Sequence, residues 1–264
     1  MELFNDTDLD RLIKSHARSG RLWFNSRRRI SSRVLQKICK ALTLFCKKLH
    51  LVHLAAVSEN WLEHNKNLFR NASQRLLIDA LRAGYFDCFV DLGAHVGEQT
   101  FLAAKYVPVF AFEPDPHAFV KLQSFKKENE CKNEVKLFNH AAYDFDGFSH
   151  LYFHKRGPEN TASSSLEKKK NNLGKENIVV ETVDIGKFLK LLNYESILLK
   201  CDIEGAEYDV FRSLGRNNIF QDISLILTEF HDPKIPRQWV QSLRLTFFDR
   251  YRYGIGRRHL VEWL

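Results

Sequence analysis

The chain has 264 residues, of which 44% are hydrophobic and 27% charged, as expected for a soluble globular protein with one domain and an extension or with two small domains. Its net charge of +8 favours an anionic partner such as nucleic acid, an acidic glycan or an anionic membrane surface, although a basic surface without a specific partner has the same charge. No apolar run reaches the roughly 18–20 residues of a membrane span and residues 1–10 lack a signal-peptide core, so we expect a cytoplasmic protein.

The cysteines indicate reduced thiols. They are odd in number and form no C-x-x-C pair, which argues against a disulfide framework or a zinc site. We expect most of them to be buried: Cys39, Cys46, Cys88, Cys131 and Cys201.

The first eighty residues predict a helical extension, because they contain few glycines and no proline. Residues 34–52 carry an apolar stripe at helical spacing with lysines off the stripe. This basic amphipathic helix could contact an anionic membrane peripherally or hold an acidic substrate, but basic faces are common and docking on the main domain is the commoner arrangement. Residues 71–83, closed by Gly84, predict a further helix. We therefore expect a helical extension over 1–80 and a second domain over 81–264.

From residue 86 the pattern becomes an alternation of strands and helices. Continuous apolar strands separated by helices predict an α/β fold, a doubly wound parallel sheet covered on both faces. The expected strands are 86–91, 107–113, 135–140, 178–183, 196–202 and 223–230, and the expected helices are 98–105, 116–127, 185–192, 207–214 and 235–243. Residues 245–264 predict an antiparallel hairpin, and residues 161–170 a mobile basic loop.

A glycine turn follows the first strand. Residues 89–100 read F-V-D-L-G-A-H-V-G-E-Q-T, a strand, a tight turn and a helix start, which is the geometry that presents backbone N–H groups to a ligand. Glu113 ends the next strand 22 positions after Asp91, where Rossmann-type sites place the acid that binds ribose hydroxyls. His95 stands where a pyrophosphate-binding turn has its second glycine, which favours a nucleoside with a cationic tail, such as S-adenosylmethionine. The alternative is a structural turn with a solvated Glu113.

Acidic residues follow two later strands. Asp202 and Glu204 come after the strand over 196–202, and Glu229 and His231 end the strand over 223–230. Because strand ends near the switch point of a doubly wound sheet line the ligand crevice, these side chains are expected to converge. Acids gathered there require a cation or a polar ligand.

Five segments together resemble the FkbM family of S-adenosylmethionine-dependent methyltransferases. They read D-L-G-A-H-V-G-E-Q-T, A-F-E-P-D-P, N-H-A-A-Y-D-F-D-G, L-K-C-D-I-E-G-A-E and L-T-E-F-H, within residues 86–232. The resemblance implies a seven-stranded Rossmann-like methyltransferase sheet ending in an antiparallel strand. It also implies O-methylation of a hydroxyl on a sugar, a polyketide or a similar small molecule. His95 departs from the asparagine that members of the family often carry.

The resemblance further implies a binding site for S-adenosylmethionine at the strand ends. The residues on its methionine side would be Asp91, Gly93, Ala94, His95, Gly97, Thr100 and Asp202. On its nucleoside side, Glu113 would bind the ribose hydroxyls, and the adenine would be surrounded by Pro114, Asp115, His140 and Ala141.

A hydroxyl acceptor must also lose a proton. The candidate bases are His231, Glu204 and Asp202, in that order, because a neutral imidazole suits operation near neutral pH. A structural strand-end histidine is an equally good interpretation of His231. In a less favoured alternative, Asp202, Glu229 and His231 hold a divalent metal, which nothing in their spacing requires.

Three other functions have weaker support. A nucleic-acid methyltransferase would fit the charge, but the segment after the fourth expected strand reads C-D-I-E-G rather than an N-P-P-Y-like motif, and no Pro-Cys nucleophile is present. A dehydrogenase is disfavoured because the chain lacks the second glycine of a pyrophosphate-binding turn. An inactive cofactor-binding or membrane-peripheral protein would not need the intact set of Asp91, Glu113 and Asp202. The acceptor itself, which the charge suggests to be acidic, has no motif.

Overall fold

The computed structural model describes residues 74–128, 130–231, 235 and 260–262. The chain divides into two compact units, Met1–Asp79 with Val261–Leu264, and Ala80–Leu260. Most of the expected N-terminal extension, including its amphipathic helix, lies outside the described residues, as do the helix expected over 235–243 and most of the C-terminal hairpin. Among the helices that are described, none is long and apolar enough to cross a membrane.

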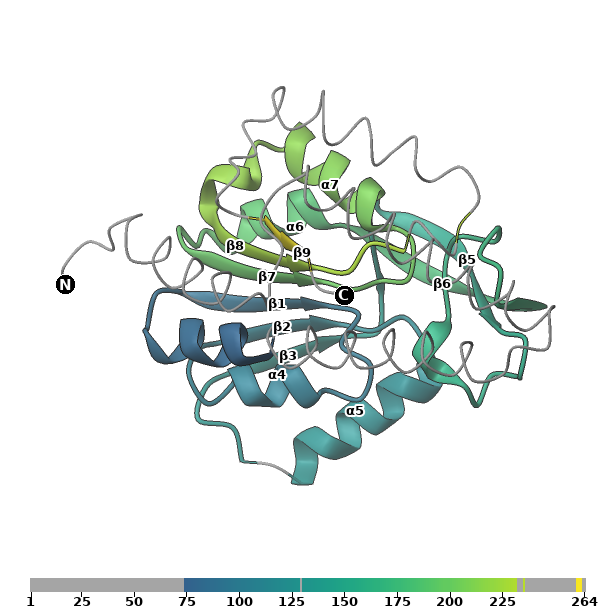
Figure 1. The fold of residues 1–264 in the computed structure, drawn as a ribbon, viewed down its shortest axis with the longest axis horizontal. Helices are drawn as coiled ribbons and strands as arrows, with labels where there is room; N and C mark the ends of the chain where they lie inside the picture. The colour runs from purple at the N-terminus through teal and green to yellow at the C-terminus, as the bar shows by residue number, and fades with distance from the viewer. Residues whose placement is uncertain (1–73, 129, 232–234, 236–259, 263–264) are drawn as a thin grey trace, which may run out of the picture. The chain divides into compact units, whose positions relative to one another are not determined.

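A parallel sheet forms the centre of the second unit. Its strands are β1 (Cys88–Leu92), β2 (Val109–Phe112), β3 (Val135–Phe138), β7 (Ile197–Cys201) and β8 (Ile223–Thr228), in the order β3-β2-β1-β7-β8. Every pairing among these five strands is parallel, so their arrowheads point the same way in Figure 1. A further short strand, β9 (Leu260–Glu262), ends the described chain. The parallel α/β class is therefore confirmed, with five of the expected strands close to their predicted bounds.

Helices separate these strands along the chain. They are α4 (Glu98–Ala103), α5 (Pro116–Glu128), α6 (Ile185–Leu192) and α7 (Glu207–Arg216), joined by the short 3₁₀ turns η1 (Thr161–Ser163) and η2 (Ile219–Asp222). In Figure 1, α4 and α5 lie beside the β1–β3 half of the sheet, and α6 and α7 beside β7 and β8. Residues 74–82 form one more helix, as predicted. The helices thus cover the sheet.

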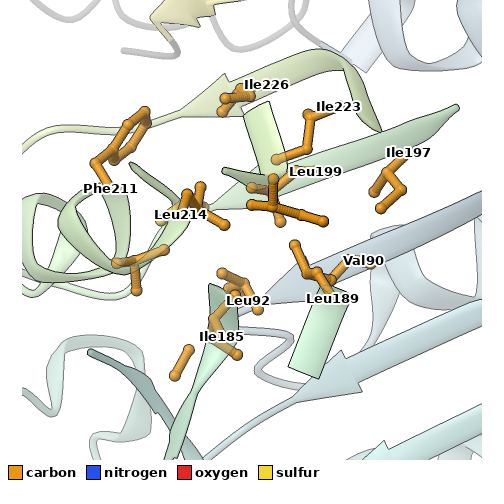
Figure 2. Packing of buried hydrophobic residues seen from close by; sticks show 14 of the residues in the cluster. Val90, Leu92, Ile185, Leu189, Ile197, Leu199, Phe211, Leu214, Ile223 and Ile226 are labelled. Atoms are coloured by element: carbon orange, nitrogen blue, oxygen red, sulfur yellow. The ribbon is translucent and has the colours of Figure 1, made fainter. Parts of the chain in front are cut away.

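Burial on both faces explains the unbroken apolar strands. Every residue of β1 is buried. Val90 and Leu92 belong to a core cluster that also contains Ile185 and Leu189 of α6 and Leu214 of α7 (Figure 2). Each fully buried aliphatic side chain of this kind contributes about 1.5–3 kcal/mol relative to an exposed one. The core therefore fixes the strands whose ends carry the polar residues of the site.

A second, three-stranded sheet corrects one prediction. The strand expected over 178–183 does not join the parallel sheet. It belongs to the longer β6 (Leu173–Asp184), which pairs with β4 (Ala141–Tyr143) and, in antiparallel fashion, with β5 (Gly147–His154). The strands β4 and β5 were not predicted, because β5 alternates first between partly buried and exposed residues and then between buried and partly buried ones, and so lacks a continuous apolar run.

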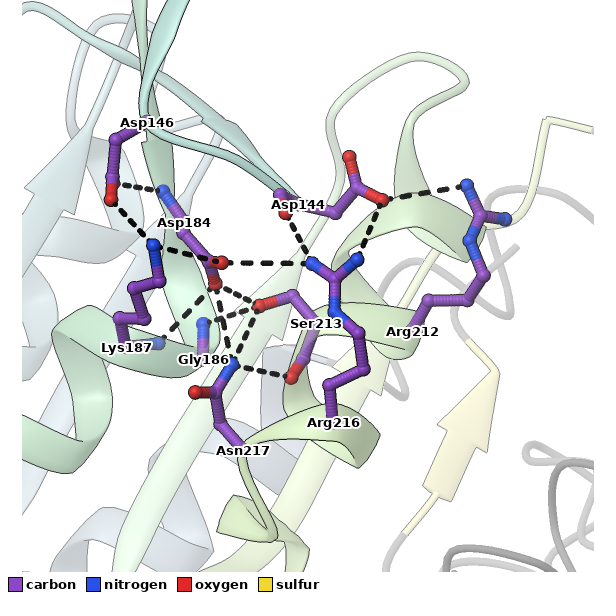
Figure 3. Close-up of polar contacts among 9 residues, drawn as sticks. All are labelled: Asp144, Asp146, Asp184, Gly186, Lys187, Arg212, Ser213, Arg216 and Asn217. Carbon is purple, nitrogen blue, oxygen red and sulfur yellow. Dashed lines mark hydrogen bonds and ion pairs between the residues drawn. The ribbon is translucent and has the colours of Figure 1, made fainter.

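A polar network fastens this second sheet to the helices of the first (Figure 3). Asp184, the last residue of β6, caps α6 by accepting a hydrogen bond from Lys187 N at 3.3 Å and also accepts one from Ser213 Oγ of α7. Ser213 Oγ in turn accepts from Gly186 N at 2.8 Å, and Arg216 lies 3.6 Å from the Asp184 carboxylate. Because Asp184 is buried, losing these partners would leave an uncompensated charge.

Candidate functional site

The parallel strands end in register, which brings polar residues from distant parts of the chain to one edge. Leu92 pairs with Phe112 on one side and with Cys201 on the other, and Cys201 pairs with Thr228. The backbone pairing continues one step further, since Asp202 N donates to Leu92 O at 3.1 Å. The next residues of the four strands are therefore neighbours at the carboxyl edge: Gly93, Glu113, Asp202 and Glu229.

The turn after β1 needs its glycines for internal packing. Gly93 has φ 80°, and a Cβ there would lie less than 3 Å from the backbone oxygen of Asp202. Gly97 has φ 96°, and its Cβ would collide with Phe101 and Leu122. Left-handed backbone combined with such close contacts allows no side chain. The two glycines were predicted because they let a ligand approach the backbone. They are also required for the turn to pack against the end of β7 and against α5.

Asp91 is buried beneath this turn and has two protein partners. Thr100 Oγ1 donates to Asp91 Oδ2 at 2.7 Å, and Lys200 Nζ donates to Asp91 Oδ1 at 2.9 Å. Lys200 Nζ also donates to Gly93 O at 2.8 Å. Burial alone would lower the pKa of Lys200, but the charges of Asp91 and Asp202 outweigh it and raise the pKa. Lys200 was not among the predicted site residues, although a lysine within an apolar strand is itself a signal of a buried partner.

Glu113 supports the turn from the neighbouring strand. Its side chain is 6% exposed, and its two oxygens accept hydrogen bonds from His95 N at 2.8 Å and Asp115 N at 2.9 Å. Burial raises the pKa of Glu113 to about 7, against the effect of these two backbone donors. The carboxylate predicted for the ribose therefore lies directly beside the glycine turn.

Asp115 and His140 complete this side of the edge. Asp115 is buried, caps α5 by accepting from His117 N at 2.9 Å, and accepts from Ser164 Oγ at 2.7 Å. His140 Nε2 lies 3.1 Å from a carboxylate oxygen of Glu181, while its buried Nδ1 has no hydrogen-bond partner among the described residues. Of the remaining predicted residues, Ala94 and Ala141 are buried and Pro114 is half-buried.

Residues 161–170 form a strap across the edge, where a mobile loop was expected. Thr161 Oγ1 lies 2.8 Å from His95 Nε2, and Ser165 Oγ donates to Glu204 O at 2.6 Å. Lys170 Nζ lies 2.5 Å from Glu204 Oε2 and donates to Ser163 O at 2.8 Å, with its side chain fully buried. The composition suggested mobility because hydroxyl and lysine side chains are common in loops. Here the same side chains fasten the strap.

His231 is the centre of an acidic cluster at the ends of β7 and β8. The residue is 1% exposed, and its Nδ1 lies 2.7 Å from Glu207 Oε1. Its Nε2 faces carboxylate oxygens of Glu204 at 3.1 Å, Glu229 at 3.6 Å and Asp202 at 3.8 Å. The three predicted catalytic residues are therefore together. Glu207 was not among the predicted site residues, although its place in the first turn of α7, beside the predicted acids, was an available signal.

The surrounding carboxylates set the charge of this imidazole. Burial lowers the pKa of His231, but the close contacts with Glu204 and Glu207 outweigh burial and raise the pKa to about 10. A neutral imidazole was predicted for His231, whereas in this arrangement the ring holds a proton at neutral pH. The His95 imidazole, in contrast, has a pKa lowered by burial and by Lys121.

The buried cysteines have no part in the site. Burial raises the pKa of the Cys88 thiol to about 12 and that of Cys201 well above its usual value. Because the thiolate is the nucleophile, these two residues of the sheet are inert. Cys39 and Cys46 lie outside the described residues.

The site thus has two halves at one sheet edge. The first half combines the glycine turn with Glu113, Asp115 and His140, and the second is the cluster around His231. Asp202 joins them, because its backbone packs against Gly93 and its carboxylate faces His231. An open parallel sheet with polar groups at its carboxyl edge is the arrangement of α/β proteins that bind ligands at that edge.

A comparison with protein families identifies the class. The model of the methyltransferase FkbM domain matches residues 91–254, more than half of the chain. The chain therefore belongs to the FkbM methyltransferase family, as its motifs indicated. No curated protein and no solved structure shows significant similarity to it.

Proposed function

We propose that the chain is an S-adenosylmethionine-dependent O-methyltransferase acting on a hydroxyl of a sugar, a glycan or another small molecule. The buried carboxylate of Glu113 beside the glycine turn is the observation that carries this proposal. We further propose that the parallel sheet belongs to the seven-stranded methyltransferase type, with its last strands within residues 245–264. The membership of the FkbM family supports both statements.

The donor half fits the nucleoside part of S-adenosylmethionine. Each Glu113 oxygen accepts one backbone hydrogen bond and keeps acceptor capacity for a ribose hydroxyl. If His140 Nε2 carries its proton toward Glu181, the orphaned Nδ1 is an acceptor suited to the exocyclic amine of adenine. Burying an imidazole nitrogen without a partner is costly, so a ligand donor there would remove a real penalty.

The methionine side rests on the glycine turn. Asp91 orders this turn through Thr100 and Lys200, so a direct contact with the cofactor ammonium would have to share its carboxylate oxygens. The Asp202 side chain is 29% exposed and so is more open to a ligand than that of Asp91, which is 1% exposed. We therefore propose that Asp91 positions the glycine turn. We propose that Asp202 lies between the methionine part of the cofactor and the acceptor.

When bound, S-adenosylmethionine supplies the methyl group of its sulfonium for displacement by the acceptor oxygen. The chain's contribution is alignment of that oxygen and removal of its proton. His231, Glu204 and Asp202 are the proposed catalytic groups. Because the His231 ring already holds a proton at neutral pH, we propose that Glu204 or Asp202 accepts the proton of the hydroxyl and that His231 orients their carboxylates. Replacing His231 with Ala should slow turnover more than it weakens cofactor binding. A wild-type rate would remove His231 from the mechanism.

The acceptor and the location of the enzyme are also proposals. The net charge of +8 favours an acidic small molecule or glycan over a neutral one. The same charge would suit a nucleic-acid substrate. The segment at the end of β7 does not favour that substrate, because it reads C-D-I-E-G rather than an N-P-P-Y-like motif. We propose a cytoplasmic enzyme. The basic stretch over residues 34–52 is the part of the chain proposed for peripheral contact with a membrane surface, although docking on the main domain is the favoured arrangement.

Calorimetry with the full chain tests the cofactor. We expect saturable binding of S-adenosylmethionine, none of NAD, and at least a tenfold weaker affinity in Glu113→Gln. Glu134→Gln is the matched control, because Glu134 is an exposed acid before β3, at the opposite edge of the sheet. Binding of NAD alone would overturn the proposal. Transfer of a labelled methyl group to paired neutral and acidic hydroxylated sugars then tests the acceptor class.

A further inference from the structure

We propose that Asp202, Glu229 and His231 bind a divalent cation of the Mn²⁺ and Mg²⁺ class. Each residue offers one ligand atom, and these atoms lie within 4.8 Å of one another. They come from the ends of the neighbouring strands β7 and β8, so the rigid sheet fixes their separation. Metal binding itself is independent of the proposed function, but its catalytic consequence rests on that function.

A second observation points to a ligand between these side chains. His231 is 1% exposed, and its Nε2 makes no hydrogen bond with any described residue. The nearest oxygen, Glu204 Oε2, is 3.1 Å away outside hydrogen-bond geometry and lies 2.5 Å from Lys170 Nζ. A buried imidazole nitrogen aimed at several carboxylates is the arrangement that a cation completes.

The distances suit an octahedral ion. Ligand atoms about 2.1 Å from a metal are roughly 3.0 Å apart in cis positions and roughly 4.2 Å apart in trans positions. His231 Nε2 is 3.6 Å from Glu229 Oε1 and 3.8 Å from Asp202 Oδ1, so small rotations of two partly exposed carboxylates would close the site. Two carboxylates and one imidazole leave further positions for water and substrate.

The supporting residues also fit a metal site. Glu207 Oε1 lies 2.7 Å from His231 Nδ1, and it also accepts from Gly205 N at 2.9 Å. A bound cation would displace the proton that the ring holds at neutral pH in its absence. The Glu207 carboxylate on Nδ1 then fixes the tautomer and turns the lone pair of Nε2 toward the metal. Glu207 is fully buried, so its position is rigid. Lys170 offsets the charge of Glu204, and Asp202 and Glu229 each offer one carboxylate ligand atom.

Such a cation would act on the acceptor. Coordination of the acceptor hydroxyl lowers its pKa and fixes the direction of the oxygen lone pair. The hydroxyl proton then passes to a nearby carboxylate or to solvent. The oxygen forms a bond to the methyl carbon while the bond from carbon to sulfur breaks, giving a methyl ether and a neutral thioether. No oxidant or reductant is needed.

Mn²⁺ binding to the full chain, freed of metal by chelation, tests the proposal. We expect one equivalent of Mn²⁺ to bind by electron paramagnetic resonance, with nitrogen coupling from the imidazole. Glu229→Gln and Asp202→Asn should each weaken binding at least tenfold, and His231→Gln should abolish the nitrogen coupling. Glu195→Gln is the matched control, because Glu195 is an exposed acid before β7 whereas Asp202 follows the same strand. Circular dichroism confirms that each variant is folded.

The outcomes separate this proposal from the proposed function. Absence of Mn²⁺ binding at millimolar concentration would overturn the metal site, as would variants that bind like the wild type. Binding of Zn²⁺ without Mn²⁺ would overturn the octahedral assignment. Calorimetry with S-adenosylmethionine on the same metal-free samples reports on the donor half alone. If S-adenosylmethionine does not bind while Mn²⁺ binds normally, the proposed methyltransferase mechanism is wrong but the metal site is retained.

Discussion

Lys200 Nζ bridges Asp91 and the glycine turn, lying 2.9 Å from Asp91 Oδ1 and 2.8 Å from Gly93 O. Both charged side chains are almost fully buried. The contact therefore joins two neighbouring strands, β1 and β7, immediately below the edge that carries the site. A lysine in this place holds the turn in position from inside the sheet.

Replacing Lys200 with Met should lower the free energy of unfolding by about 3–5 kcal/mol, because it leaves the Asp91 carboxylate buried without its cation. Adding Asp91→Asn to that variant should recover part of the loss, since it removes the uncompensated charge. Chemical denaturation measures both. The control is Lys187→Met, which removes an exposed ion pair with Asp146 and should cost at most about 1 kcal/mol. Equal effects of the two lysine variants would contradict a structural role for the buried pair.

Gly93→Ala should be far more damaging than Gly84→Ala. Both glycines have left-handed backbone, with φ of 80° and 72°, so both alanines carry a strain of about 1–2 kcal/mol. Only at Gly93 does the new Cβ also meet backbone, that of Asp202, while nothing lies within 4 Å of the Gly84 position. Thermal unfolding separates the two effects. A similar loss of stability in both variants would show that the turn and the end of β7 can move apart.

The sequence predicted the elements whose pattern is local. Continuous apolar runs identified β1, β2, β7 and β8, because strands covered on both faces need apolar residues at every position. Glu113 was found from its spacing after Asp91, since that spacing reflects one strand–helix–strand unit. The convergence of Asp202, Glu204 and His231 followed from the parallel order of the strands.

Pairings between distant segments could not be predicted in the same way. The hydrogen bonds of Ser164 with Asp115 and of Ser165 with Glu204 join residues far apart in the chain. The position of a serine in the sequence does not indicate which distant residue its hydroxyl will bind. The second sheet was missed because β5 is covered on one face only. Lys200 was a clear signal left unused, because a lysine in a buried strand requires a counter-charge.

The pKa of Glu113, raised to about 7 by burial, predicts a pH dependence of stability. The unfolded carboxyl titrates near 4.5, so between pH 4.5 and 7 the folded protein binds more protons than the unfolded one. Stability from this group is therefore fully present below pH 4.5 and falls as the pH rises to 7, by on the order of 3 kcal/mol. Glu113→Gln should flatten this part of the profile of unfolding free energy against pH. An unchanged slope would assign it to other groups.

The same titration predicts the opposite trend for the cofactor. The ionised Glu113 carboxylate is the better acceptor for ribose hydroxyls, so affinity for S-adenosylmethionine should fall about tenfold from pH 8 to pH 6. Calorimetry at the two pH values measures the change. Glu113→Gln should bind weakly at both. A wild-type affinity that is constant with pH would mean that the ribose is held by another group.

Lys170 fastens the strap over residues 161–170 to the acidic cluster, through its contacts with Ser163 O and Glu204 Oε2. Lys170→Met should destabilise the protein by about 3 kcal/mol, because it removes a fully buried cation from its carboxylate. Loosening should be greatest in the strap, so trypsin should cleave faster after Lys168 and Lys169. Limited proteolysis followed by mass spectrometry measures the rate at each bond.

The matched control for this variant is its neighbour. Lys169 is exposed, so Lys169→Met removes the same charge without touching the cluster. Cleavage after Lys168 should keep the wild-type rate in this control and rise in Lys170→Met. Because the strap also contacts His95 and Asp115, added S-adenosylmethionine should slow that cleavage in both variants if the donor half lies beneath it. Identical cleavage of the two variants would show that the strap is held by its serines and Thr161 alone.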